Sequence, residues 1–163
     1  MPLVEAGAST IKLAGARAMH PSDLHVTLCF LGSVDESRIE ALRLRAAALR
    51  ADAFTLQFDR IELWRESRVL VAACSQIPAA GQALAQGLQL AASELGLAPD
   101  RKSWRPHLTL ARSVLPRHLP AEMQAERPLT NSLAWSASSF FLAESLLSAQ
   151  PRRYATLGSW PLR

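Results

Sequence analysis

Residues 24–28 read L-H-V-T-L, and residues 106–110 read P-H-L-T-L. In each copy, a histidine and a threonine two positions apart stand among apolar neighbours. Successive side chains of a strand point to opposite faces, so the pairs His25/Thr27 and His107/Thr109 would each share one face. The alternate residues would face the core, which in the first copy are Leu24, Val26, Leu28 and Phe30 and in the second are Leu108 and Leu110. The repeat predicts two similar halves, each with one strand of this design.

Two such pairs, facing each other across a cleft, would bring together two imidazoles and two hydroxyls. An imidazole can accept or donate a proton near neutral pH, because its ordinary pKa is about 6.5. Threonine hydroxyls can hydrogen-bond the non-bridging oxygens of a phosphate. One base, one acid and two phosphate-binding hydroxyls are the groups that displacement at a phosphodiester requires.

A single H-x-T sequence is usually only a strand with a polar surface residue. With four histidines and six threonines in the chain, two chance matches are expected on the order of one time in a hundred. The pair therefore favours a site. His20 and His118 lack this context and are expected to be ordinary polar residues.

Helices are expected over residues 35–51, with Ser33 or Asp35 as N-cap, and over residues 79–95, with Gly96 as a stop signal. Strands are expected over residues 24–31, 54–63, 68–74, 107–111, 138–143 and 153–160. Residues 113–131 hold three prolines and predict a surface loop long enough to act as a lid. Strands and helices alternate without a parallel-sheet rhythm, which favours an α+β fold.

The chain has 163 residues, a size typical of one domain spanning residues 1–163. Its net charge of +4 comes from basic residues spread along the chain, which fits a solvated surface as well as nucleic-acid binding. Cys29 and Cys74 lie far apart and form no C-x-x-C pair, as expected in a reducing cytoplasm. No apolar run approaches the ~20 residues of a membrane span, and residues 1–18 do not resemble a signal peptide.

Other catalytic designs fit less well. The sequence contains neither H-E-x-x-H nor a cysteine cluster for zinc. It also lacks the G-x-S-x-G elbow of serine hydrolases and a glycine-rich P-loop. No metal and no cofactor is therefore expected.

The motifs H-V-T-L-C-F-L-G, from His25, and R-P-H-L-T-L-A-R, from Arg105, resemble the two signatures of the two-histidine phosphoesterases. More narrowly, the chain is similar to the bacterial RNA 2',3'-cyclic phosphodiesterases, also called 2'-5' RNA ligases. The lead-in P-S-D-L, the stretch F-L-A-E-S-L and the W-P-L ending add to a resemblance that covers residues 15–163.

The resemblance implies a bilobal α+β fold with antiparallel sheets flanked by helices and the active site between the lobes. His107 would be the general base toward water, and His25 the general acid toward the departing 3'-oxygen. The product would be a 2'-phosphomonoester, formed without metal or ATP, and the reverse reaction would join RNA ends. Thr27 and Thr109 would bind phosphate.

Arg112 matches the arginine that closes the second signature and would bind phosphate. Strict alternation places it opposite His107, so this role requires the strand to end or bulge first. The family's first strand is expected to be missing or truncated within residues 1–14. The expected partner is RNA, or a nucleotide, with a 2',3'-cyclic phosphate end, and the chain is expected to be a monomer without membrane contact.

Two alternatives stay open. The same chemistry could act on 2'-5' oligonucleotides or on a cyclic-phosphate metabolite such as an ADP-ribose derivative. Otherwise the chain could be a non-catalytic module that binds RNA ends.

Overall fold

Two antiparallel sheets and two α-helices make up the described part of the chain, which in this computed structural model comprises residues 16–100, 102–119, 126–146 and 154–163. The larger sheet has the order β1-β4-β3-β2-β5, and the smaller one pairs β6 with β7. The strands are β1 (Arg17–Ala18), β2 (Phe54–Trp64), β3 (Val69–Cys74), β4 (His107–Arg112), β5 (Arg127–Ala137), β6 (Ser139–Ser145) and β7 (Tyr154–Pro161). The helices are α2 (Ile39–Ala48) and α3 (Ala79–Glu94), with 3-10 turns η1 (Pro21–Asp23), η2 (Glu36–Arg38) and η3 (Pro116–His118). This arrangement is the expected α+β fold.

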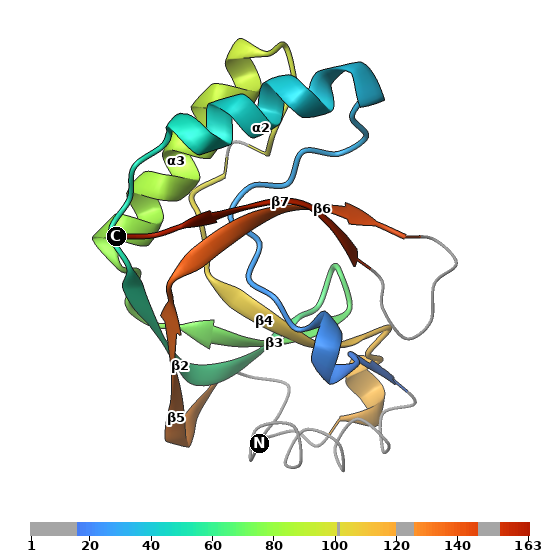
Figure 1. The fold of residues 1–163 in the computed structure, drawn as a ribbon. Coiled ribbons are helices and arrows are strands. Elements are labelled where there is room, and N and C mark those ends of the chain that lie inside the picture. Colours follow the sequence, from blue (N-terminus) through green and yellow to red (C-terminus); the bar gives the residue numbers. More distant parts are fainter. Residues whose placement is uncertain (1–15, 101, 120–125, 147–153) are drawn as a thin grey trace.

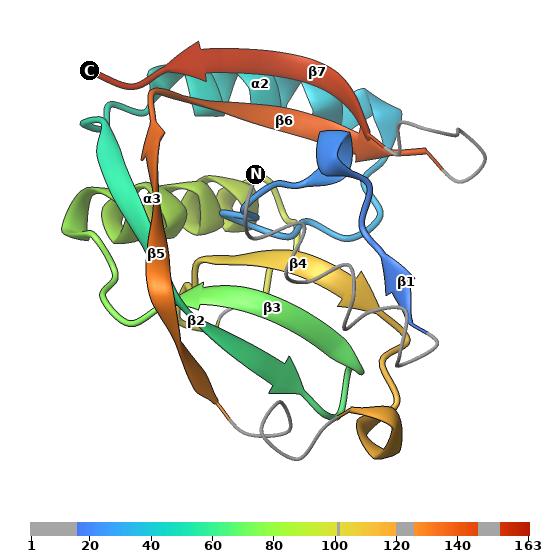
Figure 2. The same ribbon diagram turned by 90° about the horizontal axis from the view of Figure 1, so that it is seen from below.

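The two sheets define the two lobes (Figures 1 and 2). Helix α2 lies along the smaller sheet and contacts β7, while α3 packs beside α2. The segment that leads from β1 to α2, drawn in blue, passes between the two sheets in both views. This segment carries the first H-x-T motif, and β4 of the larger sheet carries the second.

Helix α3 confirms the prediction for residues 79–95. Its buried face is made of small and aliphatic side chains, namely Gly81, Leu84, Ala85, Ala91 and Ala92. The helix ends where Gly96 adopts a φ of +72°, a conformation that glycine adopts without a steric penalty. The other helical prediction, residues 35–51, corresponds to η2 followed by α2. Asp35 flanks η2, but its side chain makes no capping hydrogen bond.

The main core lies between α3 and one face of the larger sheet. Its buried members are Leu56, Phe58, Ala72, Ala85, Trp104, Leu108 and Leu110. Leu24, Val26 and Leu28 pack against this core, as predicted. Phe30 does not, because its side chain is 70% exposed.

Two predictions need correction. Residues 24–31 form no strand, since they join no β-ladder with any described residue, and the carbonyl of Thr27 instead accepts a hydrogen bond from the indole of Trp104. The predicted loop over residues 113–131 contains η3 and the first residues of β5, which pairs with β2. Residues 120–125 lie outside the described residues, as do residues 1–15, where the family's first strand was expected to be missing or truncated.

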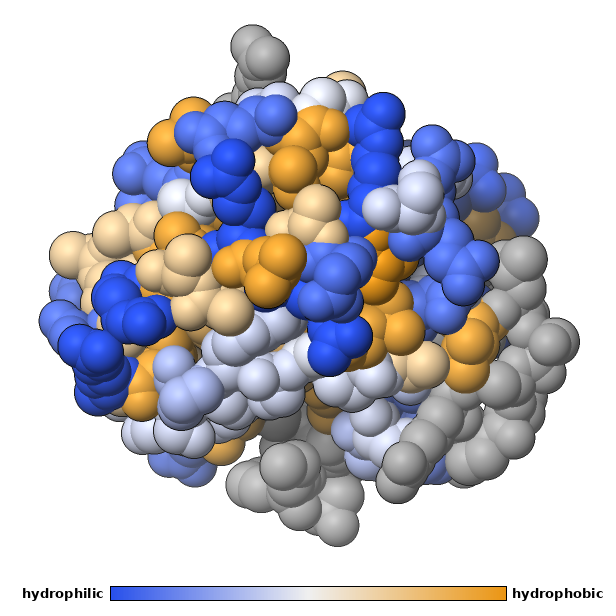
Figure 3. Space-filling model, turned by 45° about the horizontal axis from the view of Figure 1, so that its top comes forward, coloured by the Kyte–Doolittle hydropathy of each residue, from blue (hydrophilic) through white to orange (hydrophobic). Residues whose placement is uncertain are grey.

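In the described part of the chain, neither helix has the length and apolarity needed to cross a membrane. The view in Figure 3, with the top of Figure 1 brought forward, shows apolar residues interspersed with charged ones. This face therefore presents no continuous apolar surface.

Candidate active site

The face of the larger sheet opposite α3 carries the second motif. In an antiparallel pair, directly opposed residues point to the same face. Ala73 opposes His107 and Val71 opposes Thr109. Val71 and Ala73 are buried beneath this face together with Val69, and Trp64 packs against them. The strand pattern thus places the histidine and the threonine side by side, as the sequence predicted.

A β-bulge in β4 brings Arg112 to the same face. Thr109 opposes Val71, whereas Ala111 opposes Leu70, so β4 holds one extra residue between these pairs. Leu110 and Ala111 are both buried, and the alternation resumes with Arg112 half-exposed. A bulge of this kind was the condition for Arg112 to act beside His107.

The ring of His107 is held in one orientation. Its Nδ1 lies 2.8 Å from the carbonyl oxygen of Arg105. A carbonyl oxygen can only accept, so Nδ1 carries the proton and Nε2 is left for chemistry. The Trp64 ring packs against the imidazole at a centroid distance of 4.4 Å.

This environment favours neutral imidazole. Burial lowers the pKa of His107 below its ordinary value, and the hydrogen bond to the Arg105 carbonyl only partly opposes this. The charges of His25, Arg105 and Arg112 lower the pKa further. A histidine with a lowered pKa is ready to accept a proton at neutral pH.

His25 has a matching arrangement in the segment that passes between the two sheets. Its Nδ1 lies 2.7 Å from the carbonyl oxygen of Asp23, again the residue two positions earlier. Its Nε2 is therefore also the free ring nitrogen. The edge of the ring meets Tyr154 of β7 at a centroid distance of 4.6 Å. Both imidazoles thus share one tautomer and one kind of aromatic neighbour.

Two features connect the motifs. The charge of His25 is among the causes that lower the pKa of His107, so the two rings lie within electrostatic range of each other. In addition, the buried Trp104, just before the second motif, donates from Nε1 to the carbonyl of Thr27 at 2.9 Å. Within the described residues, no hydrogen bond engages the hydroxyl of Thr27 or Thr109. Neither hydroxyl is thus occupied by this part of the chain, and each can bind a ligand.

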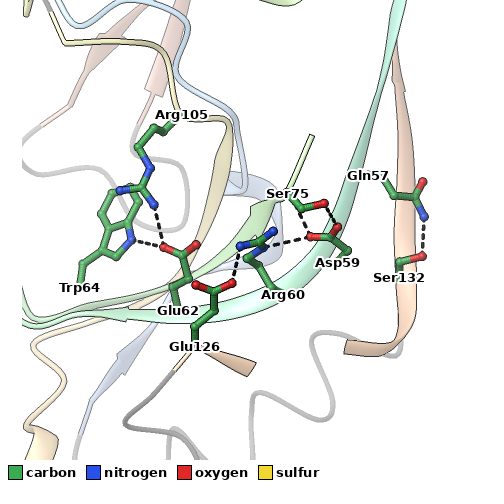
Figure 4. Close-up of polar contacts among 9 residues, drawn as sticks. All are labelled: Gln57, Asp59, Arg60, Glu62, Trp64, Ser75, Arg105, Glu126 and Ser132. Atoms are coloured by element: carbon green, nitrogen blue, oxygen red, sulfur yellow. Dashed lines mark hydrogen bonds and ion pairs between the residues drawn. The ribbon is translucent and has the colours of Figure 1, made fainter. Parts of the chain in front are cut away.

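An acidic side chain supports the wall beside His107 (Figure 4). Glu62 accepts from the Trp64 indole at 2.8 Å and from the Arg105 guanidinium at 3.0 Å. The same guanidinium stacks over the Trp64 ring, 5.3 Å from its centroid. Glu62 itself is only 13% exposed. Trp64 is therefore fixed on its polar edge and on one face while it covers His107.

The aromatic neighbours were not found from the sequence. Trp64 lies on β2 and Tyr154 on β7, both far from the motifs along the chain. Period-2 alternation along residues 60–64 would place Trp64 and Glu62 on one face, but nothing local indicates that this is the face of His107. Among the described residues, no three His, Cys, Asp or Glu side chains are grouped closely enough to hold a metal ion.

The chain is similar in sequence to proteins of a known family. An RNA 2',3'-cyclic phosphodiesterase of Escherichia coli is 30% identical over 146 residues, which are 90% of this chain and 80% of that protein. The chain belongs to the LigT-like phosphoesterase family. The family model described as "LigT like Phosphoesterase" matches residues 4–71 of this chain. A second relative, the RNA 2',3'-cyclic phosphodiesterase of Bacillus subtilis, is 30% identical over 141 residues. The match covers 77% of this chain and 76% of that protein.

Solved LigT-like structures share the fold. E. coli LigT complexed with 3'-AMP superposes with a TM-score of 0.84 at 28% identity, covering 98% of this chain and 88% of that one. TT0787 of Thermus thermophilus superposes with a TM-score of 0.79 at 26% identity, covering 99% of this chain and 90% of that one. The bilobal α+β fold and the membership in a family of phosphodiesterases are thereby confirmed.

Proposed function

We propose that this LigT-like phosphoesterase hydrolyses the 2',3'-cyclic phosphate at RNA ends to a 2'-phosphomonoester, without metal or ATP. One observation carries the proposal: both motif histidines are held by the same Nδ1–H bond to a backbone carbonyl and have Nε2 free. The relatives in E. coli and B. subtilis that carry the name RNA 2',3'-cyclic phosphodiesterase support the choice of substrate.

In the proposed reaction, Nε2 of His107 removes a proton from water as its oxygen attacks phosphorus. The bond between phosphorus and the 3'-oxygen breaks, and protonated His25 donates a proton from Nε2 to that oxygen. The hydroxyls of Thr27 and Thr109 donate to the non-bridging oxygens, and Arg112 places a positive charge farther along the same face, where it can bind the substrate. The lowered pKa of His107 favours it for the base role. Each proton transfer contributes roughly 10²–10⁴ in rate.

The same residues would also catalyse RNA joining. Attack by a 5'-hydroxyl in place of water, with the 3'-oxygen again leaving, would join two RNA ends through a 2'-5' bond, with His107 as base and His25 as acid as in hydrolysis. The imidazoles would exchange roles when that bond is cleaved in the reverse direction. We propose hydrolysis as the main activity because water is always in large excess. Incubating a 2',3'-cyclic phosphate end with a 5'-hydroxyl end, and measuring joined product, tests the joining reaction.

The deciding experiment uses an RNA oligonucleotide with a 2',3'-cyclic phosphate, in EDTA, with product analysis. We expect a 2'-phosphate end, and we expect His25→Ala and His107→Ala each to lower kcat by roughly 10²–10⁴. His20→Ala is the matched control, because His20 is exposed and its side chain hydrogen-bonds only to Ser22 in the described residues. Turnover that survives either motif substitution, or that stops in EDTA, would contradict the proposal.

A further inference from the structure

Arg17 and Arg112 stand directly opposite each other where β1 pairs with β4. Directly opposed residues of an antiparallel pair have Cβ atoms about 4.5–5.5 Å apart and point to one face. Two positive charges in this arrangement repel and destabilise the strand pair. The sheet therefore concentrates positive charge at its β1 edge.

Neither guanidinium is neutralised by the described residues, in which no ion pair or side-chain hydrogen bond engages Arg17 or Arg112. Two other arginines near His107 differ, because each is paired with acidic side chains. Arg60 pairs with Asp59 and Glu126, and Arg105 pairs with Glu62 (Figure 4). Within the described residues, the charges of Arg17 and Arg112 are therefore unpaired, whereas those of Arg60 and Arg105 are paired.

The arginine pair lies on the same face as the candidate active site. The bulge in β4 returns Arg112 to the side of His107 and Thr109, and its opposite residue Arg17 follows it. Same-face neighbours on a strand are roughly 7 Å apart, so the pair lies one such step beyond Thr109 and two beyond His107. A phosphate bound between the two histidines would not occupy the position of the arginine pair, which could therefore bind a different anion.

We propose that Arg17 and Arg112 together bind a second phosphate of the substrate, the internucleotide phosphate that precedes the terminal nucleotide. The inference rests on the proposed function and specifies its substrate class, an RNA 3' end of two or more nucleotides. Each guanidinium presents a planar fork of donors that matches the two non-bridging oxygens of a phosphodiester. Binding of that anion would also relieve the repulsion between the two charges.

The experiment compares two substrates, a nucleoside 2',3'-cyclic monophosphate and a dinucleotide that ends in a 2',3'-cyclic phosphate. In Arg17→Gln, we expect kcat/KM on the dinucleotide to fall about tenfold or more beyond any change on the mononucleotide, since a hydrogen bond to a charged group is lost. The dependence of log KM on log salt should also become shallower by roughly 0.7 for the dinucleotide only, as one phosphate contact disappears.

Arg127→Gln is the matched control, because Arg127 is an exposed strand arginine on β5, the opposite edge of the same sheet. It should leave both substrates and the salt slope unchanged. Thermal unfolding of Arg17→Gln at low salt should show a Tm equal to or above that of the wild type, because a like-charge contact is removed.

An equal loss on both substrates would mean that Arg17 acts at the scissile phosphate, and no loss on either substrate would mean that it binds no phosphate. Either result overturns the inference. Absence of turnover on both substrates in the wild type would instead contradict the proposed function, so the two failures are distinguishable.

Discussion

Gly81 in α3 is the position where one added methyl group should disturb both the core and the candidate site. A Cβ there would lie 2.6 Å from Cζ3 and 2.7 Å from Cη2 of Trp104, and 3.1 Å from Cε2 of Phe54. The Trp104 ring has little room to move. It is 5% exposed, meets Phe54 edge-on, and is fixed by its hydrogen bond to the Thr27 carbonyl.

The expected loss of stability for Gly81→Ala is the balance of two effects. Replacing glycine by alanine inside a helix stabilises by about 1 kcal/mol. Overpacking a tight core costs about 1–3 kcal/mol. The net change is a destabilisation of up to about 2 kcal/mol, and for a chain of this length each kcal/mol lowers Tm by about 2–4 °C. Because Trp104 holds Thr27, kcat/KM on a cyclic phosphate should fall as well.

Gly87→Ala, in the same helix, is the control for helix propensity. Its nearest neighbour would be Cδ2 of Leu49 at 3.2 Å, the end of a flexible side chain that can shift by a few tenths of an ångström. We expect this variant to be at least as stable as the wild type and fully active. Calorimetry and steady-state kinetics on both variants check the reasoning. If Gly81→Ala proved as stable as Gly87→Ala, the packing argument would be refuted.

Further predictions concern the titrating groups and the phosphate-binding hydroxyls. Because the base must be unprotonated and burial lowers the pKa of His107, kcat/KM should reach half its maximum below pH 6.5 on the acidic side; a midpoint above 6.5 would contradict this. Replacing Trp64 by leucine uncovers the ring, so the midpoint should move to higher pH, and an NMR titration of His107 should show the same direction. Burial raises the pKa of Cys29 and of Cys74 to about 11, so both thiols should react slowly with iodoacetamide at pH 7.5 in the native protein and quickly after unfolding. Thr109→Val keeps the shape but removes the hydroxyl, so kcat/KM should fall about tenfold or more with little change in Tm; an unchanged rate would argue against phosphate contact there.

Much of the fold could be predicted from the sequence, where a local signal determines the element. Helix α3 has apolar residues at helical spacing and a glycine stop, and its predicted bounds differ from the observed ones by one residue. Strand β5 was missed entirely, and its first residues were placed in a loop, because its side chains are mostly exposed and give no clear alternation. It is held by pairing with β2, which is a tertiary effect that local composition does not reveal. The opposite error was made for residues 24–31. Their apolar alternation is typical of a strand, but they have no ladder partner among the described residues, so they form none.

The candidate site was predictable only as far as the repeated motif extends. The repeat identified both histidines and both threonines, and the structure brings the two imidazoles within range of each other's charge. The face on which Arg112 lies depends on a bulge that shows only in the pairing with β3. Trp64 and Tyr154 come from strands remote in sequence, so their contacts with the imidazoles required the three-dimensional fold.

The backbone anchors of the two imidazoles have a consequence for how the site responds to mutation. In many histidine-based sites a neighbouring carboxylate selects the tautomer, and a single substitution can delete it. Here the acceptors are the main-chain carbonyls of residues 23 and 105, and every amino acid supplies that oxygen. Side-chain replacement at those positions therefore leaves the acceptor for Nδ1 in place, while a change in the path of the chain two residues upstream would disable the histidine itself.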